Sequence, residues 1–166
     1  MKIVEATQEH IPIIQAVSNI VWPHTFKEIL STDQITYMMD MMYSTDALNK
    51  QMEILNHHYL LAEEDGEYWG YLSYELNYKE TGSTKIHKIY VLPNTQGKGV
   101  GRTLINFTEA LAIQNVNTSL LLNVNRFNKA INFYQKMGFE IIGNEDIDIG
   151  NGFLMEDYVM NKKFDQ

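Results

Sequence analysis

The clearest chemistry in the sequence lies in three alternating glycines, Gly97, Gly99 and Gly101. They separate an apolar run typical of a strand, residues 86–92, from a helical pattern of apolar residues that begins at Val100. The first turn of a helix has unbonded N–H donors and the positive end of the helix dipole, so this arrangement attracts anions. Glycines let such an anion approach the backbone closely. The segment is therefore predicted to bind a pyrophosphate.

Two common phosphate-binding patterns do not fit this segment. A dinucleotide fingerprint needs glycine at the first, third and sixth places, and counting from Gly97 the sixth place is Arg102. A Walker loop needs Gly-Lys-Ser/Thr after a glycine and four further residues, and this is absent from the sequence. The pattern present is Gln96-x-x-Gly99-x-Gly101 directly after a strand. A tight turn that merely begins a helix remains the alternative.

The composition limits the classes of protein that the chain can belong to. A length of 166 residues with 45% hydrophobic and 20% charged residues predicts one globular domain, residues 1–166. The net charge of −8 argues against nucleic-acid binding and favours a cationic small substrate. No apolar run approaches the roughly 20 residues of a membrane span, and the N-terminus is not a signal peptide. We therefore expect a cytoplasmic protein with no membrane partner.

The absence of cysteine excludes disulfides, thiolate metal sites and a cysteine nucleophile. His10, His24, His57 and His58 do not show the spacing of metal ligands, so no metal site is expected.

The elements that must position the glycines follow from hydrophobic periodicity and turn signals. The expected order is a strand near Ile3, helices within 12–55, strands 58–63 and 68–77, strand 85–92, a helix from Val100, strand 119–124, helix 128–137, and strands 139–142 and 152–160 joined by an acidic loop. Asp33 and Thr45 are the expected helix N-caps. The inward stripe expected for the helix after the glycines is Val100, Leu104, Phe107 and Leu111. This order predicts a mixed α/β domain.

Two stretches carry a resemblance to a known family. The pattern Gln96-x-x-Gly99-x-Gly101 resembles motif A of the GNAT superfamily of N-acetyltransferases, and residues 122–139, which include Tyr134, resemble motif B. The resemblance covers nearly the whole chain and implies a twisted, mostly antiparallel sheet that splays between its fourth and fifth strands and is flanked by helices. A narrower likeness is to the bacterial spermidine/spermine acetyltransferase branch, and it rests on Thr25-Phe26-Lys27-Glu28, Ile89-Tyr90-Val91 and residues 133–139.

The resemblance implies acetyl-CoA as the cofactor, with its pyrophosphate on the glycines and its pantetheine arm beside the preceding strand. The implied cofactor-binding residues are Ile89, Tyr90, Val91, Gln96, Gly97, Lys98, Gly99, Val100, Gly101, Arg102, Thr103, Asn125, Asn128 and Tyr134. The place of the usual family asparagine, seven residues before the tyrosine, is taken by Phe127. Whether Asn125 or Asn128 contacts the cofactor is left open.

Acetyl transfer from a thioester to an amine requires a deprotonated amine, a donor to the developing oxyanion and an acid for the departing thiolate. Direct attack in a ternary complex is simpler than an acyl-enzyme, because the chain has no cysteine. The backbone N–H of Val91 is the expected oxyanion donor, and the resemblance makes Tyr134 the acid. For the base we expect His87, on the same strand face as Ile89 and Val91, then Glu75, with water alone as the alternative.

The expected reaction is acetylation of a primary amine of a small molecule, with a polyamine-like amine as the leading class. Trp22, Tyr37 and Tyr43 lie in the region that would wall the acceptor, although core packing is the simpler interpretation. An acidic group, Glu145, Asp146 and Asp148, would either attract a polyamine or form a solvated loop.

The alternatives are a protein N-terminus or lysine, an aminoglycoside-type amine, and a catalytically degenerate CoA-binding regulatory domain. A homodimer is a further expectation, since dimers are common in the superfamily. The acceptor, the oligomeric state, the identity of the base, the pathway and the organism stay open at the level of sequence.

Overall fold

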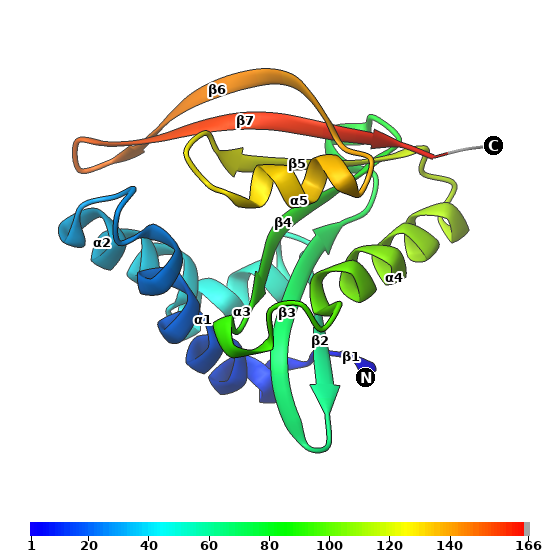
Figure 1. The fold of residues 1–166 in the computed structure, drawn as a ribbon, viewed down its shortest axis with the longest axis horizontal. Coiled ribbons are helices and arrows are strands. Elements are labelled where there is room, and N and C mark those ends of the chain that lie inside the picture. Colours follow the sequence, from blue (N-terminus) through cyan, green and yellow to red (C-terminus); the bar gives the residue numbers. More distant parts are fainter. Residues whose placement is uncertain (165–166) are drawn as a thin grey trace.

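One seven-stranded sheet organises the chain in the computed structural model, which describes residues 1–164 (Figure 1). The strands lie in the order β1-β2-β3-β4-β5-β7-β6, and every neighbouring pair is antiparallel except β4 and β5. They are β1 (Lys2–Glu5), β2 (His58–Glu64), β3 (Glu67–Glu75), β4 (Ser83–Val91), β5 (Ser119–Asn125), β6 (Glu140–Gly150) and β7 (Phe153–Lys163). The expected mixed, mostly antiparallel sheet is confirmed.

Five α-helices flank the sheet: α1 (Ile11–Phe26), α2 (Thr32–Tyr43), α3 (Thr45–Glu53), α4 (Val100–Gln114) and α5 (Ala130–Lys136). The side chain of Ser31 accepts from the N–H of Gln34 and begins α2, and Ser44 caps α3 in the same way. The caps expected at Asp33 and Thr45 are wrong by one or two residues, because a serine hydroxyl precedes each of them. No helix within the described residues is long and apolar enough to cross a membrane.

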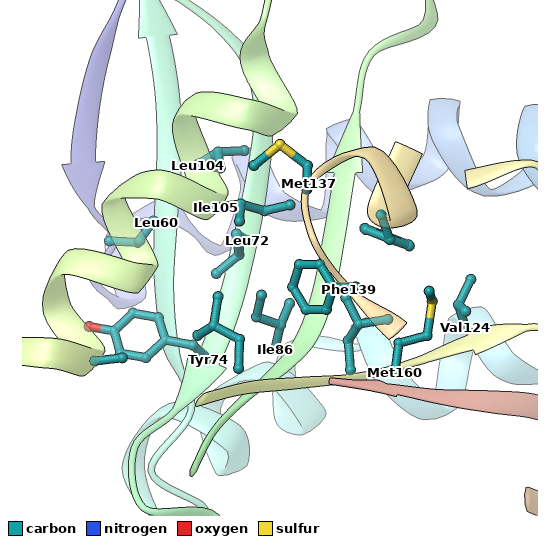
Figure 2. Packing of buried hydrophobic residues seen from close by; sticks show 14 of the residues in the cluster. Leu60, Leu72, Tyr74, Ile86, Leu104, Ile105, Val124, Met137, Phe139 and Met160 are labelled. Atoms are coloured by element: carbon teal, nitrogen blue, oxygen red, sulfur yellow. The ribbon is translucent and has the colours of Figure 1, made fainter. Parts of the chain in front are cut away.

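Two hydrophobic cores lie on opposite faces of the sheet. The core shown in Figure 2 packs α4 and α5 against the strands and includes Leu104, Ile105 and Phe139. The second core holds α1, α2 and α3 against the other face. The expected inward position of Phe107 is wrong, since its side chain is 40% exposed whereas that of Ile105 is fully buried. The buried face of α4 is therefore turned slightly about the helix axis from the face that the spacing predicts.

The sheet splays between β4 and β5. Parallel pairing joins residues 83–86 of β4 to residues 119–122 of β5 and ends at Ile86 and Leu122. Strand β4 nevertheless continues to Val91, and β5 continues to Asn125. The two strand ends diverge beyond the last pair, which leaves backbone groups on both sides of a gap. The splay expected between the fourth and fifth strands is confirmed.

The last two strands form a long hairpin that reaches α2 (Figure 1). The acidic loop expected to join two short strands is wrong, because β6 runs to Gly150 and pairs with β7 through the acidic residues. The hydroxyl of Tyr37 donates to the carbonyl of Ile149 at 2.7 Å, and Nε2 of Gln34 donates to the carbonyl of Leu154 at 2.8 Å. We call this contact between α2 and the β6–β7 hairpin the roof.

Candidate active site

A cavity of about 1010 Å³ occupies the splay between β4 and β5. The ends of these strands, the loop before α4 and the start of α5 line one part of it. Side chains of α1, of the segment 27–30 that follows it and of α2, together with Met155 and Asp157 of β7, line the rest. The cavity therefore has a part beside the glycines and a part beneath the roof.

The glycine loop, residues 96–101, presents its backbone to this cavity. Gly97 and Gly99 have φ of +82° and +76°, and a Cβ built on either would meet nothing within 4 Å. The first helical bond runs from the N–H of Thr103 to the carbonyl of Gly99, so the three preceding N–H groups have no helical acceptor. A Cβ on Gly101 would instead lie 3.2 Å from Phe133, so this glycine lets α4 and α5 pack closely. The arrangement suits an anion.

Most of the residues predicted to bind the cofactor line the cavity. Those lining it are Ile89, Tyr90, Val91, Gln96, Gly97, Gly99, Val100, Gly101, Arg102, Asn125, Asn128 and Tyr134. Lys98 and Thr103 are not among the lining residues. The Lys98 ammonium lies 4.9 Å from the centre of the Trp69 ring, and the Thr103 hydroxyl donates to the carbonyl of Gly99 at 2.8 Å. Both side chains are thus engaged outside the cavity.

Asn125 and Asn128, the two candidates for contact with the cofactor, form the same kind of hydrogen bond within the chain. The side-chain oxygen of Asn125 accepts from the N–H of Phe127, and that of Asn128 accepts from the N–H of Ala130, both at 2.9 Å. Each asparagine therefore shapes the turn between β5 and α5. Within residues 1–164 neither amide nitrogen donates a hydrogen bond, so both remain available to a ligand.

The backbone of β4 offers hydrogen-bonding groups to the cavity. The N–H of Leu92 donates to the carbonyl of Trp69 on β3 at 2.8 Å. In an antiparallel pair, successive residues direct their N–H and C=O groups alternately toward and away from the partner strand. Ile89 and Val91 therefore direct theirs away from β3, into the splay. This is the placement that an oxyanion donor and a partner for an extended ligand require.

Tyr134 lies in α5 and lines the cavity with only 7% of its surface exposed. Burial raises the pKa of its phenol well above the usual value, which keeps the hydroxyl protonated. Within the described part of the chain this hydroxyl forms no hydrogen bond with another residue, and it is not fully enclosed. It is a protonated donor without a protein partner at the edge of the cavity.

A β-bulge changes the direction of His87. Two neighbouring residues of β3 pair with Lys88 and Ile86, so His87 is an extra residue on β4. Ile89 and Val91 pack against the core beneath α4 and α5, whereas His87 stacks on His57, which follows α3. The expectation that His87 shares a strand face with Ile89 and Val91 is wrong, because the bulge interrupts the alternation.

His87 and Glu75, the two candidate bases, lie in contact. Nε2 of His87 is 3.0 Å from Oε1 of Glu75, and Nε2 of His57 is 3.7 Å from the same oxygen. Burial lowers the pKa of both histidines to about 4, with Lys88 contributing to each shift. Both imidazoles are therefore neutral near pH 7. His87 lines the cavity, whereas Glu75 is not among the lining residues.

The same three side chains offer metal-ligand atoms within 4.8 Å of one another. The two imidazole rings are stacked, however, with centroids 3.9 Å apart and planes inclined by only 15°. A metal ion bound to imidazole nitrogen lies close to the plane of the ring, and no single point lies near both of these planes. The group is arranged as a hydrogen-bonded stack, not as a shared metal site.

Of the three candidate substrate-binding residues, only Trp22 lines the cavity. Its indole N–H donates to the hydroxyl of Tyr43 at 3.0 Å, and the hydroxyl of Tyr71 also donates to Tyr43. Tyr43 is 4% exposed and belongs to the core, and Tyr37 belongs to the roof. These aromatic residues shape the part beneath the roof mainly by packing behind it.

Several polar residues that line the cavity were not predicted from the sequence, among them Lys88, Asn123 and Asp157. Lys88 donates to Gln51 and Tyr59, and burial lowers its pKa to about 7. Asn123 and Asp157 line the cavity from β5 and β7 and share a hydrogen bond. The signal available for Lys88 was a basic residue inside the apolar strand pattern of residues 86–92, which is typical of a buried functional group.

The comparisons with known proteins agree with this geometry. The family model described as "Acetyltransferase (GNAT) family" matches residues 19–139. An uncharacterized N-acetyltransferase in the pepI 3′ region of Lactobacillus delbrueckii subsp. lactis is 24% identical over 144 residues, which is 83% of each chain. The peptidyl-lysine N-acetyltransferase YjaB of Salmonella typhimurium is 34% identical over 61 residues, or 36% of this chain and 39% of that protein. The PaiA N-acetyltransferase of Thermoplasma acidophilum, solved in complex with coenzyme A, has a TM-score of 0.81 and 23% identity over 98% of both chains.

Proposed function

Because the chain belongs to the acetyltransferase (GNAT) family, we propose that it transfers the acetyl group of acetyl-CoA to the primary amine of a small molecule. A polyamine-like amine is the leading acceptor class. The proposal is supported by a cavity that runs from the glycine loop, through the splay, to the space beneath the roof. The first part suits the cofactor and the second suits the acceptor.

In the proposed complex the pyrophosphate lies against the free N–H groups at the start of α4, and Arg102 adds positive charge beside it. The pantetheine arm runs along the splay and pairs with the backbone of Ile89 and Val91. Either Asn125 or Asn128 donates to the arm from the opposite side. The fold neighbour of Thermoplasma acidophilum was solved with coenzyme A, which supports this cofactor.

Transfer then proceeds by direct attack in a ternary complex. The amine attacks the thioester carbonyl, and the backbone N–H of Val91 stabilises the developing oxyanion. Tyr134 gives its phenolic proton to the departing sulfur, since its hydroxyl has no hydrogen-bond partner among the described residues and stays protonated. The stack of His57 and His87 has pKa values near 4 for its imidazoles, and His87 brings a neutral hydrogen-bonding group to the cavity.

The roof is the observation that most favours a small molecule as the acceptor. Two hydrogen bonds, from Tyr37 and Gln34 of α2, hold the β6–β7 hairpin over the acceptor part. A folded protein surface does not fit beneath such a cover, whereas a linear amine enters end-on. The net charge of −8 and the exposed Glu145 on the hairpin favour a cationic molecule.

A lysine side chain of a protein is the second candidate, since it is also a primary amine on a flexible chain. The local likeness to a peptidyl-lysine N-acetyltransferase favours it. That likeness covers 36% of this chain, so it bears on the shared segment alone.

The first experiment is a thermal-shift titration with acetyl-CoA, CoA, ATP and NAD, followed by assay of thiol release on an amine panel that starts with spermidine. A ligand that binds only the folded state raises the melting temperature by mass action. We expect acetyl-CoA and CoA, but not ATP or NAD, to raise the melting temperature. We also expect turnover with linear diamines and polyamines. Binding without turnover on any amine or lysine peptide would favour a degenerate CoA-binding domain. The absence of any shift with CoA would overturn the cofactor assignment.

A further inference from the structure

A buried carboxylate lies in the acceptor part of the cavity and has no role in the scheme above. Asp157 of β7 is only 2% exposed and lies opposite Asn125 in the β5–β7 register. It lines both the main cavity and a smaller neighbouring cavity of about 310 Å³. A buried carboxylate is costly unless something compensates its charge. Its partners therefore indicate what it is for.

The compensation within the chain is incomplete. Nδ2 of Asn123 donates to Oδ2 of Asp157 at 3.3 Å, and the ammonium of Lys85 donates to Oδ1 of the same asparagine. Asn123 thus stands between the lysine and the carboxylate. Asp157 forms no ion pair in the part of the chain that the structure describes, and its Oδ1 accepts no hydrogen bond there. That oxygen is also not fully enclosed, so it is available to a ligand.

The charged groups around Asp157 leave a net negative site. Glu145 lies opposite it in the β6–β7 register, and Lys85 and Arg126 are the nearby cations. Arg126 pairs with Asp146, and Lys85 donates to the neutral amide of Asn123, so three carboxylates lie beside two cations. Burial raises the pKa of Asp157, which makes its carboxylate a better proton acceptor than an exposed aspartate.

We propose that Asp157 receives the ammonium group of the acceptor amine and takes its proton before acetyl transfer. The proposal rests on the proposed function, and it names the residue that prepares the nucleophile. The class of ligand is a primary ammonium on a narrow, linear chain, because the carboxylate lies beneath the roof at the side of the splay.

One proton passes from the ammonium to the Asp157 carboxylate, which leaves a neutral amine with a free electron pair. That pair forms the new N–C bond, and the C–S bond breaks with its electrons remaining on sulfur. Tyr134 protonates the sulfur to give CoA, and the tetrahedral nitrogen returns a proton to the phenolate. Asp157 releases its proton to solvent, so the net products are the amide, CoA and one proton.

The test compares Asp157→Asn with Glu156→Gln, using the full chain and a linear diamine. The two variants remove the same charge from adjacent residues of β7, and Glu156 is exposed and directed to the opposite face. For Asp157→Asn we expect kcat to fall about 100-fold and the acidic limb of the kcat/KM–pH profile to disappear. Asp157→Glu, which keeps a carboxylate, should recover part of kcat together with that limb. Glu156→Gln should behave like the wild type.

The thermal shift with acetyl-CoA shows whether each variant still folds and binds the cofactor. A kcat within about 3-fold of the wild type in Asp157→Asn, with the acidic limb retained, would overturn the proposal and leave the proposed function standing. In Asp157→Asn, a raised KM for the amine with an unchanged kcat would overturn the proton transfer, and Asp157 would then only bind the ammonium group. If the wild type acetylates no amine, the proposed function itself fails, and this result does not depend on any variant.

Discussion

The cofactor part and the acceptor part of the cavity are built in opposite ways. The cofactor part comes chiefly from one continuous stretch, in which the end of β4, the glycine loop and the start of α4 follow one another. The acceptor part combines residues of α1 and the segment up to Leu30 with residues of α2, β4, β5 and β7. Local backbone geometry creates the first, whereas packing of distant segments creates the second. The two parts should therefore respond differently to substitution.

The largest effect should come from Gly99→Glu. The new side chain places bulk and negative charge where the pyrophosphate approaches, so CoA affinity should fall at least about 100-fold, or about 3 kcal/mol. The measurement is calorimetric titration with CoA. Gly82→Glu is the control, because Gly82 has the same φ of +76° and the same open surroundings, but lies before β4. Equal losses in both variants would assign the effect to backbone strain and contradict the cofactor site.

The next effect, at the boundary between the two parts, should come from Tyr134→Phe. Removal of the phenolic proton donor should lower kcat about 100-fold and leave CoA affinity within about 2-fold. Tyr74→Phe is the control, since Tyr74 is 3% exposed in the same core. A Tyr134→Phe enzyme with normal kcat would show that this tyrosine only packs.

The roof should affect the acceptor part alone. Tyr37→Phe removes one hydrogen bond to the β6–β7 hairpin, worth about 1 kcal/mol, so KM for the acceptor should rise about 5-fold. CoA affinity should not change. Steady-state kinetics with both substrates separates the two outcomes, and Tyr68→Phe on β3 serves as the control. An unchanged acceptor KM would mean that the roof does not limit access.

The smallest effect should be a change in acid stability caused by the histidine stack. His57 and His87 have pKa values lowered to about 4 by burial, so the unfolded chain binds more protons than the folded chain between about pH 6.5 and 4. Stability is therefore lost as pH falls through this window, by up to about 2 kcal/mol per histidine at pH 5.

The substitution His57→Gln should remove roughly half of this loss of folding stability at low pH. Urea unfolding at pH 7 and pH 5 measures it, with the exposed His58→Gln as the control. An identical acid loss in the His57→Gln variant and the wild type would show that the stack is not buried as described.

Much of the fold followed from local patterns. Alternation and turn signals located the β2–β3 hairpin, and helical spacing located α4 and α5. The predictions were wrong where a neighbouring element changed the secondary structure or the burial that the local pattern indicated. The acidic residues of β6 are in a strand because β7 provides a continuous partner, and Phe107 is exposed because the sheet lies against the next face of α4.

The sequence by itself determined the glycine loop, since three glycines, a strand end and a helix start act through their own backbone over a few residues. Only the tertiary structure decided the acceptor part. The bulge at His87 depends on pairing with β3, and the contact with Glu75 depends on that bulge. Asp157 faces the cavity because β7 pairs with β5 in one particular register. Long-range pairing leaves no local spacing in the sequence, and so these residues become a site only when the sheet forms.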